Sequence, residues 1–568
     1  MKEISRRNFI GGAAAFGLGL GAMGLAGCAA GEPASTGAEV GSANQTGVRD
    51  AAGVPSFLRE PDPITDDQIA QTIETELAVV GLGVAGVSAV RSAAEAGVKV
   101  VAIEKCSEPN CRSSQFAAFN TENARSMGIE DIETTDLVNE LMIQMSHRSD
   151  FRILKRWADN CGEAFDWYAS AYDDLIWVHP GDETPSEDKV YVSNKNSYPP
   201  YEYGRDHEVI FSGTLSFTAP EKGGQKPVFL ANFEKAEATG NVDAHFDCPA
   251  RQLVKDGDRV VGVIFQNLND QTYTKVLASK GVVLATGDYV RNDEMVAYYL
   301  PWIYNQKEKF TFTYMHQDIE GNFADMGDGH RMGMWAGAHM EKGPLAPMTH
   351  HMGAALGVDA FLQLNVRGER FMNEDIPGQN IMDQLSTQPE MRSWQIIDSK
   401  WPEQLSVQGT GHGYVNYYIP DSEADQWPAV VGEEMSASFS GYTTDSMFEA
   451  AITHKADTLE ELVEMMGLPK ETALASIERY NLFPVENGPF YACEFGDAGM
   501  LVCMGGLDTD AECRALDDSM EPIPGLYVAG NTMGNRYKVE YPVTEAGISL
   551  ATALVFGRLA GTKAAAGE

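Results

Sequence analysis

The spacing of apolar and polar positions changes twice between residues 76 and 105. Leu77 to Val80 form a short apolar run typical of a buried strand, and Val87 to Ala96 have the spacing of a helix. Val98 to Ile103 form a second apolar run, and the glycine-rich turn GLGVAG joins the first strand to the helix. The pattern therefore predicts a strand, a tight turn, a helix and a second strand in that order.

The turn residues suit a dinucleotide. Gly81 permits the tight turn, Gly83 lets the backbone approach a pyrophosphate, and Gly86 allows close packing of the helix. The N-terminus of the helix attracts the anion. Glu104 follows the first glycine by 23 residues, where a ribose hydroxyl needs an acceptor. The unit predicts a dinucleotide site, but FAD and NAD share this fingerprint.

A third apolar stretch lies near the N-terminus, just after the adjacent residues Arg6 and Arg7. It is weakly apolar, spans about 17 residues and follows a charged region, which indicates a twin-arginine export signal rather than a membrane-spanning helix. The stretch ends in Leu-Ala-Gly-Cys, which resembles the lipobox of bacterial lipoproteins. We expect residues 1–27 to be the signal, Cys28 to carry a lipid anchor on the outer face of the cytoplasmic membrane, and residues 28–70 to be a flexible tether. A plain signal with a chance cysteine is the alternative.

Charge and cysteine spacing exclude two classes of partner. The chain has 42 basic and 82 acidic residues and a formal net charge of −40, which argues against a nucleic-acid partner. Seven cysteines follow Cys28, and none forms a C-x-x-C pair. We therefore expect neither a bound metal nor a covalently attached haem.

Three later segments bear on the choice between FAD and NAD. VVLATGDYVRN (residues 282–292), PIPGLYVAGN (residues 522–531) and GISLATALVFGRLAG (residues 547–561) resemble, in this order, segments of flavoproteins with two dinucleotide folds. Over most of residues 75–561 the chain resembles the fumarate reductase and succinate dehydrogenase flavoprotein superfamily. This resemblance implies FAD and an α/β fold, in which a Rossmann-like FAD domain carries an inserted α+β capping domain.

The resemblance also implies domain limits and FAD contacts. Residues 71–342 and 499–568 are expected to form the FAD domain, and residues 343–498 the cap that closes over substrate. Membrane-complex members bond FAD to a histidine where this chain has Ser114, so the resemblance implies noncovalent FAD. The residues expected to bind FAD are Gly81, Gly83, Ala85, Gly86, Glu104, Lys105, Ser113, Ser114, Gln115, Ala250, Thr286, Gly287, Asp288, Gly530, Asn531, Ile548 and Ser549.

The catalytic positions depart from the fumarate reductase pattern. Those enzymes place a histidine before a late glycine pair, in an H-T-M-G-G pattern, but here Val502 begins the sequence VCMGG. Their proton-donating arginine follows a G-E-R-F sequence, whereas Gln379 most nearly occupies that place in this chain. The C-terminal arginine pattern that grips a second carboxylate is also altered. Fumarate is therefore not the expected substrate.

Tyr541 and Pro542, followed by Gly547, resemble the YP segment of 3-ketosteroid dehydrogenases, although the loop here is two residues longer. In those enzymes a tyrosine hydroxyl and a glycine amide bind the substrate ketone and stabilise the enolate, and losing one such donor costs about 2.7 to 4 kcal/mol. A packed aromatic at a turn is the alternative for Tyr541. The other catalytic candidates, each with a structural role as the alternative, are Arg536, Tyr418 beside Tyr414 and Tyr417, and His351 beside His350.

Together these features predict an exported FAD-dependent reductase that passes hydride from flavin N5 to an activated C=C bond, with a tyrosine as proton donor. No nicotinamide site is recognisable, so we expect a membrane-linked cytochrome c or a quinol-fed partner to supply electrons in anaerobic respiration. The alternatives are a ketosteroid-type dehydrogenase running the reverse reaction and a non-catalytic flavin-binding lipoprotein. Ring enones, cinnamate-type acids and other conjugated acids all remain open as substrates.

Overall fold

The structure is a computed structural model, and it describes residues 54–178, 185–186, 188–194, 214–219, 221–312, 316–353, 361–374, 376, 381–405, 417–418, 420–422, 442–542 and 545–567. The expected signal, Cys28 and most of the expected tether lie outside the described residues, as do Gln379 and Tyr414. Within the described part of the chain, no helix combines the length and apolar character needed to cross a membrane.

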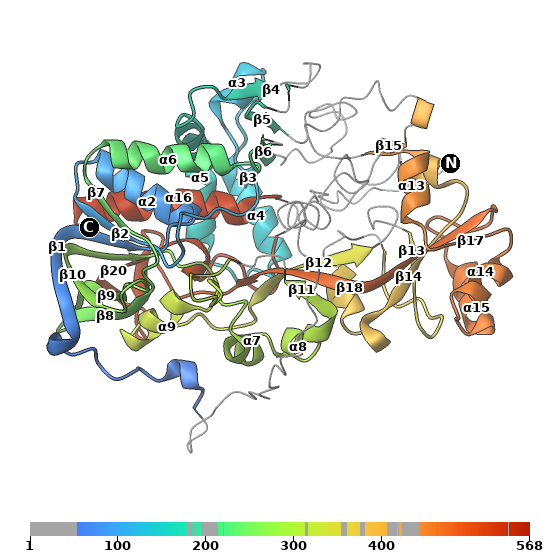
Figure 1. Ribbon diagram of the computed structural model, residues 1–568. Helices are drawn as coiled ribbons and strands as arrows, with labels where there is room; N and C mark the ends of the chain where they lie inside the picture. The colour runs from blue at the N-terminus through green and yellow to red at the C-terminus, as the bar shows by residue number, and fades with distance from the viewer. Residues whose placement is uncertain are drawn as a thin grey trace.

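An eight-stranded sheet forms the left part of the molecule in Figure 1. Its neighbouring strands β20, β10, β1, β2 and β7 pair in parallel, and β8, β9 and β19 are attached in antiparallel pairs. The C-terminal ends of β1, β2 and β10 are fully buried, as expected for parallel strands that are covered on both faces. The strands in sheet order are β19 (Arg514–Leu516), β20 (Pro522–Val528), β10 (Tyr273–Leu284), β1 (Ile69–Val80), β2 (Val100–Ile103) and β7 (Val242–His245). In addition, β9 (Arg259–Gln266) pairs with β10, and β8 (Ala250–Asp256) pairs with β9.

Helices α2 (Val84–Glu95), α16 (Ile548–Ala566) and α6 (Lys226–Ala238) lie together over this sheet (Figure 1). Glycines let α16 contact the backbone of α2. A Cβ atom at Gly557 would lie 2.2 Å from the carbonyl oxygen of Ala85, and one at Gly561 would lie 2.3 Å from that of Ala89. The two helices therefore run in the same direction with their backbones in contact, which fixes the start of α16 relative to the turn before α2.

A six-stranded sheet lies toward the right of Figure 1 and is organised around the long strand β18 (Phe490–Met504). β18 runs from this sheet back toward the large one, so the expected domain limit at residues 498/499 falls inside a single strand. The other strands of this sheet are β11 (Phe310–Phe312), β12 (Ala346–Gly353), β13 (Leu362–Asn365), β14 (Ser393–Ile397) and β17 (His454–Ala456).

Smaller elements complete the described fold. A four-stranded sheet contains β3 (Gln115–Ala117), β6 (Thr214–Thr218), β5 (Tyr191–Asn194) and β4 (Ile176–Val178), and β15 (Tyr417–Tyr418) pairs with β16 (Tyr442–Thr443). Further helices include α4 (Thr134–Gln144), α5 (Phe151–Ala169), α9 (Asp328–Trp335), α13 (Asp445–Ala451), α14 (Leu459–Met465) and α15 (Lys470–Arg479).

The predicted α/β fold with a Rossmann-like unit is confirmed, with shifted element limits. The first strand begins at Ile69 rather than Leu77, because its polar first half pairs with β10 from Tyr273 onward. The helix begins at Val84 rather than Val87, since Gly83 already occupies the N-cap position. Apolar periodicity marks only the buried part of each element, which explains both differences.

The expected flexible tether is wrong for residues 54–70. Phe57 is buried, and its ring packs against Tyr298 and Tyr299 with centroid distances of 5.6 and 5.7 Å. The carbonyl oxygen of Phe57 also accepts a hydrogen bond from the indole nitrogen of Trp335 at 3.0 Å. Phe57 and the partly buried Leu58 thus pack this segment against the domain before β1 begins, and a hydrogen bond from the N–H of Ser56 to Glu294 at 2.7 Å adds to the contact.

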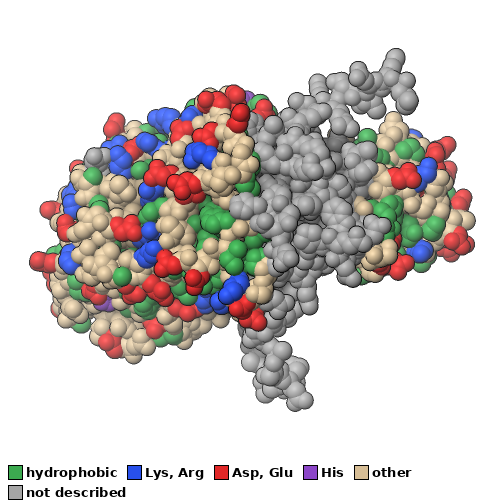
Figure 2. Space-filling view, turned by 90° about the horizontal axis from the view of Figure 1, so that it is seen from above, with side chains coloured by type: hydrophobic (Ala, Val, Ile, Leu, Met, Phe, Trp, Pro, Cys, Tyr) green, Lys and Arg blue, Asp and Glu red, His purple; other side chains and the backbone are tan. Residues whose placement is uncertain are grey.

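Acidic side chains are spread over both parts of the surface seen in Figure 2, rather than gathered in one patch. The basic side chains on this face lie between them. This distribution agrees with the net charge of −40, and the described residues on this face form no basic stripe for a phosphate backbone.

Candidate active site

A cleft opens where the C-terminal ends of β1, β2 and β10 meet the N-termini of α2 and α16. It contains about 1320 Å³ of empty space, part of which is open to solvent. Residues from segments far apart in the sequence line it, among them Gly83, Glu104, Ala250, Thr286 and Asn531. Such a long, composite cleft suits an extended ligand together with a second, smaller one.

The three fingerprint glycines have different surroundings. A Cβ atom at Gly81 would lie 2.5 Å from the carbonyl oxygen of Ala285, and one at Gly86 would lie 1.8 Å from that of Gly81, so these two glycines permit close packing. A Cβ atom at Gly83 would have no neighbour closer than 3.7 Å. Gly83 lines the cleft at the N-cap of α2, where the first helical N–H groups lack intrahelical partners and favour an anion. Gly83 therefore keeps space for the ligand.

Glu104 lies at the end of β2 and is almost fully buried. Its Oε2 accepts the N–H of Leu82 at 2.6 Å, and its Oε1 accepts the N–H of Cys106 at 2.9 Å. Burial raises the pKa of Glu104, and these backbone N–H groups oppose the rise. A carboxylate has about four acceptor positions, so the two bonds leave capacity for ribose hydroxyl groups.

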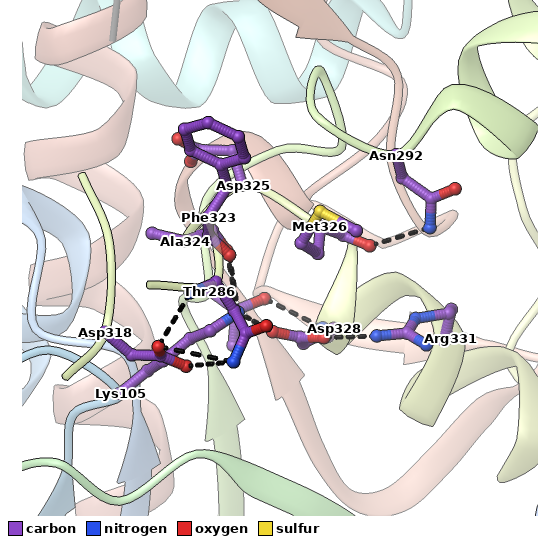
Figure 3. A network of polar contacts seen from close by, with 12 residues as sticks. Lys105, Thr286, Asn292, Asp318, Phe323, Ala324, Asp325, Met326, Asp328 and Arg331 are labelled. Carbon is purple, nitrogen blue, oxygen red and sulfur yellow. Dashed lines mark hydrogen bonds and ion pairs between the residues drawn. The ribbon is translucent and has the colours of Figure 1, made fainter. Parts of the chain in front are cut away.

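Charged side chains line another part of the cleft. Lys105 pairs with Asp328 at 2.9 Å, and Arg112 pairs with Asp325 and, at 3.1 Å, with Asp288. Figure 3 shows Lys105 directed toward Asp328 and toward the backbone of Phe323 and Ala324. Burial and the neighbouring charge of Asp325 raise the pKa of Asp288 to about 7.

Tyr541 and the start of α16 form a different part of the lining. The hydroxyl oxygen of Tyr541 accepts the backbone N–H of Ser549 at 3.1 Å. Gly547 has a φ of 79°, and a Cβ atom there would lie 2.3 Å from the carbonyl oxygen of Gln115, so the position requires glycine. The apolar side chains that line the cleft from β12, β18 and α16 are Met348, Leu501, Val502, Leu550 and Ala553.

Most of the residues expected to bind FAD line this cleft, and five do not. Gly86 serves helix packing. The Oγ of Ser114 accepts the N–H of Gln225 at 3.1 Å. Gln115 is buried in β3, where its Oε1 has no hydrogen-bond partner in the described part of the chain. Asp288 is fully buried behind Arg112, and Ile548 is fully buried at the start of α16. These five residues support the lining rather than form it.

Two further catalytic candidates lie outside the cleft lining. Arg536 is buried and donates to the carbonyl of Met533, the hydroxyl of Thr552 and the Oδ1 of Asn531, at 3.0 to 3.1 Å. Asn531 lines the cleft, so Arg536 lies behind the lining and holds Asn531 in place. The hydroxyl of Tyr418 bonds to Asp445 at 2.9 Å in the region of β15 and α13.

His351 lies in β12, where its backbone pairs with Ala498 of β18. The structure describes the backbone of this residue and of His350, but not their side chains. The expected catalytic role of His351 therefore stays a prediction.

Sequence reasoning missed several residues of the cleft. Arg112 lies two residues before Ser114, and Asp328 begins α9. Asp325 and Met348 carry no local signal, because their positions depend on how β10, α9 and β12 come together. Within the described residues, no group of three or more His, Cys, Asp or Glu side chains could hold a metal ion.

The residues present fit FAD. Gly83 leaves open space at a helix N-terminus for a pyrophosphate, and Glu104 offers acceptors to a ribose. The apolar part of the lining, with Tyr541 and Ser549 beside it, suits a flat ring system that also has polar edges.

Comparisons with known proteins agree with this geometry. The profile of the FAD binding domain matches residues 76–548. A vinyl phenol reductase of Lactiplantibacillus plantarum is 24% identical over 531 residues, which cover 86% of this chain and 96% of the relative. A urocanate reductase of Eggerthella lenta is 25% identical over 552 residues, which cover 91% of this chain and 79% of the relative.

A solved structure shares the fold. It is the 3-ketosteroid-Δ4-(5α)-dehydrogenase of Rhodococcus jostii RHA1 in complex with 4-androstene-3,17-dione, with a TM-score of 0.63 and 22% identity. The match covers 89% of this chain and 99% of that structure.

Proposed function

This chain belongs to the FAD binding domain family of fumarate reductase and succinate dehydrogenase flavoproteins, and we propose that it reduces a C=C bond conjugated to an uncharged carbonyl group. The family consists of FAD-dependent oxidoreductases that act on C=C bonds, so the predictions of family, cofactor and enzyme class are confirmed.

The observation that carries the proposal is the position of Tyr541. FAD, when bound in the cleft, supplies the hydride that is added to the double bond. Adding hydride beta to a carbonyl places negative charge on the carbonyl oxygen, and a donor aimed at that oxygen stabilises it. Tyr541 lines the cleft, its hydroxyl oxygen accepts the Ser549 N–H, and a phenol hydroxyl can act as a donor as well as an acceptor. The amide of Gly547, at the N-cap of α16, is the second donor of the proposal.

The apolar lining favours a substrate without a carboxylate. Val502 occupies the position at which fumarate reductases are expected to have a histidine, and Met348 and Leu501 lie beside it in the lining. Among the described residues that line the cleft, the Lys and Arg side chains are Lys105 and Arg112, and both are paired with aspartates. A vinyl phenol also lacks a carboxylate, so the relative of that name supports this one feature of the substrate, although its double bond is conjugated to a phenol ring rather than to a carbonyl.

The opposite direction of reaction is the second candidate. Tyr541 and Gly547 in this arrangement, and the likeness in fold to a ketosteroid dehydrogenase, both suit the removal of hydrogen from a saturated ketone. The same two donors would stabilise the same enolate in either direction, so the electron partner decides between them. We propose reduction as the physiological direction because the curated relatives reported above are named as reductases.

The FAD is proposed to be noncovalent. The histidine that bonds FAD in some relatives is replaced by Ser114, whose hydroxyl is engaged with the backbone of Gln225. Acid precipitation should therefore release FAD into the supernatant, and yellow colour that stays with the protein pellet would contradict this part of the proposal.

We further propose that residues 1–27 direct export, that Cys28 carries a lipid anchor, and that a membrane-linked cytochrome c or quinol-fed partner supplies electrons in anaerobic respiration. The adjacent arginines and the lipobox-like end of the apolar stretch support this setting. The full chain should fractionate with membranes, whereas a Cys28→Ala variant should be recovered in the soluble fraction. Equal membrane binding by both would contradict the anchor.

Reoxidation of the dithionite-reduced holoprotein under anaerobic conditions tests the activity. Ring enones should reoxidise the flavin rapidly, whereas cinnamate and fumarate should do so slowly. Reduction of the oxidised flavin by a saturated ketone, without reoxidation by the enone, would favour the dehydrogenase. No response to any substrate would indicate a binding protein, and rapid reoxidation by fumarate would contradict the proposed substrate class.

A further inference from the structure

Two basic side chains on one segment of the cleft lining reach two acidic side chains on another. Lys105 and Arg112 lie on the segment that follows β2, and Asp325 and Asp328 lie on the segment that leads into α9. All four residues line the cleft. Lys105 pairs with Asp328 at 2.9 Å, and Arg112 pairs with Asp325, so the two segments are joined twice across the same cleft.

We propose that these two ion pairs form an ionic latch that closes the cleft and slows the release of FAD. Here, ionic latch means the pairs Lys105–Asp328 and Arg112–Asp325. The inference goes beyond the reaction and rests only on the noncovalent binding of FAD proposed above. Charges that join two lining segments would add to the contacts that retain a noncovalently bound FAD.

The acidic side of the latch is held rigidly. The carboxylate of Asp318 accepts the backbone N–H groups of Glu320 and Asn322, which fixes the turn just before Phe323. Figure 3 shows this turn below the segment that carries Asp325, and Asp328 between Lys105 and Arg331. Burial acts to raise the pKa of Asp328, but the Lys105 and Arg331 cations hold it below its ordinary value. Asp328 is therefore ionised at neutral pH.

Asp325 adds a feature that points toward a ligand. Its side chain is only 4% exposed, and its Oδ2 has no hydrogen-bond partner among the described residues. A Cβ atom at Gly287 would lie 3.2 Å from its Oδ1, so the carboxylate sits over the turn that follows β10. The buried carboxylate is thus engaged by Arg112 on one oxygen, beside backbone that is expected to contact FAD.

The basic side of the latch is also anchored. The second guanidinium nitrogen of Arg112 bonds to Asp288, which is fully buried, at 3.1 Å. The ammonium of Lys105 also donates to the carbonyl of Phe323 at 2.9 Å. Opening the cleft would break the ion pairs of the latch and expose their charges to solvent. Salt screens the attraction between charges that solvent surrounds, so it favours the open state. The rate of FAD release should therefore rise with ionic strength.

The test measures FAD release from the holoprotein, since free FAD regains fluorescence. Asp325→Asn and Asp328→Asn keep the shape of each side chain and remove its charge. Each substitution should raise the release rate about 3- to 10-fold, and the double variant should raise it about 30-fold or more, with a weaker dependence on NaCl than the unmodified protein. Asp131→Asn is the matched control, because it breaks the exposed ion pair with Arg125 and should leave release unchanged.

Each result decides the matter. Release from the double variant at the rate and salt dependence of the unmodified protein would overturn the latch. Faster release with an unchanged salt dependence would also overturn it, because that pattern indicates direct bonds from the aspartates to FAD. Circular dichroism checks that the variants fold, and Arg112→Lys, which keeps the charge, should release FAD more slowly than Arg112→Gln. Failure of the unmodified protein to release FAD in acid would instead contradict noncovalent binding.

Discussion

The two ends of the cleft are built in different ways. The strand, turn, helix and acid at the α2 end come from one continuous stretch, residues 76–105, and distant residues such as Ala250 and Thr286 only complete the lining there. The end at Tyr541 is assembled from β12, β18 and the loop before α16. More than 100 residues separate β12 from β18 in the sequence. Local sequence therefore specifies the cofactor end, whereas packing between distant segments specifies the substrate end.

The strongest test of the cofactor end is Gly83→Val. The space beside Gly83 belongs to the cleft, so the new side chain should exclude FAD without clashing with protein atoms. We expect a folded, colourless protein with FAD affinity reduced by at least about 100-fold, measured by flavin absorbance and circular dichroism.

Gly86→Val provides the contrast for this test. A Cβ atom at position 86 would lie 1.8 Å from the carbonyl oxygen of Gly81, so this variant should fail to fold stably. Normal flavin content in a folded Gly83→Val protein would show that the pyrophosphate lies elsewhere.

The substrate end is tested by Tyr541→Phe. The ring keeps its packing against Tyr537, with centroids 5.3 Å apart, while the hydroxyl that accepts the Ser549 N–H is lost. Turnover should fall about 10²- to 10³-fold, the range for one lost oxyanion donor, while flavin content stays unchanged. Steady-state kinetics and flavin absorbance measure the two quantities. Full activity would leave Tyr541 with a packing role alone.

A smaller effect concerns the loop that carries Tyr541. Glu545 is almost fully buried, its Oε2 has no hydrogen-bond partner among the described residues, and burial raises its pKa well above the ordinary value. The native state therefore holds a proton that the unfolded chain releases above about pH 4.3, so stability falls as pH rises from that value toward the native pKa.

Glu545→Gln stays neutral at every pH and should remove this part of the pH dependence. Between pH 6 and pH 9, we expect the melting temperature of the variant to fall by about 1 to 4 °C less than that of the unmodified protein. Thermal denaturation of both holoproteins at the two pH values measures the difference. Parallel melting profiles would show that Glu545 is ionised in the native state.

The α/β class and the dinucleotide unit follow from short-range order in the sequence, since a turn needs its glycines and a ribose needs an acid at the end of the next strand. FAD and the departure at Val502 follow from the resemblance to a flavoprotein superfamily, which rests on segments spread along the chain. Apolar spacing could not show that β1 starts at Ile69 or that Phe57 fastens the segment before it, because the partners of both lie far along the chain.

Only the tertiary structure decided which polar residues meet. Arg112, Asp288 and Asp325 are separated by up to 213 positions, yet one guanidinium joins both carboxylates, because β2, β10 and the segment before α9 end at one edge of the sheet. The same folding placed Arg536 behind the cleft lining and the Tyr541 hydroxyl on the first turn of α16. Hydrogen bonds and ion pairs act over a few ångströms in space, and the order of residues along the chain does not fix those distances.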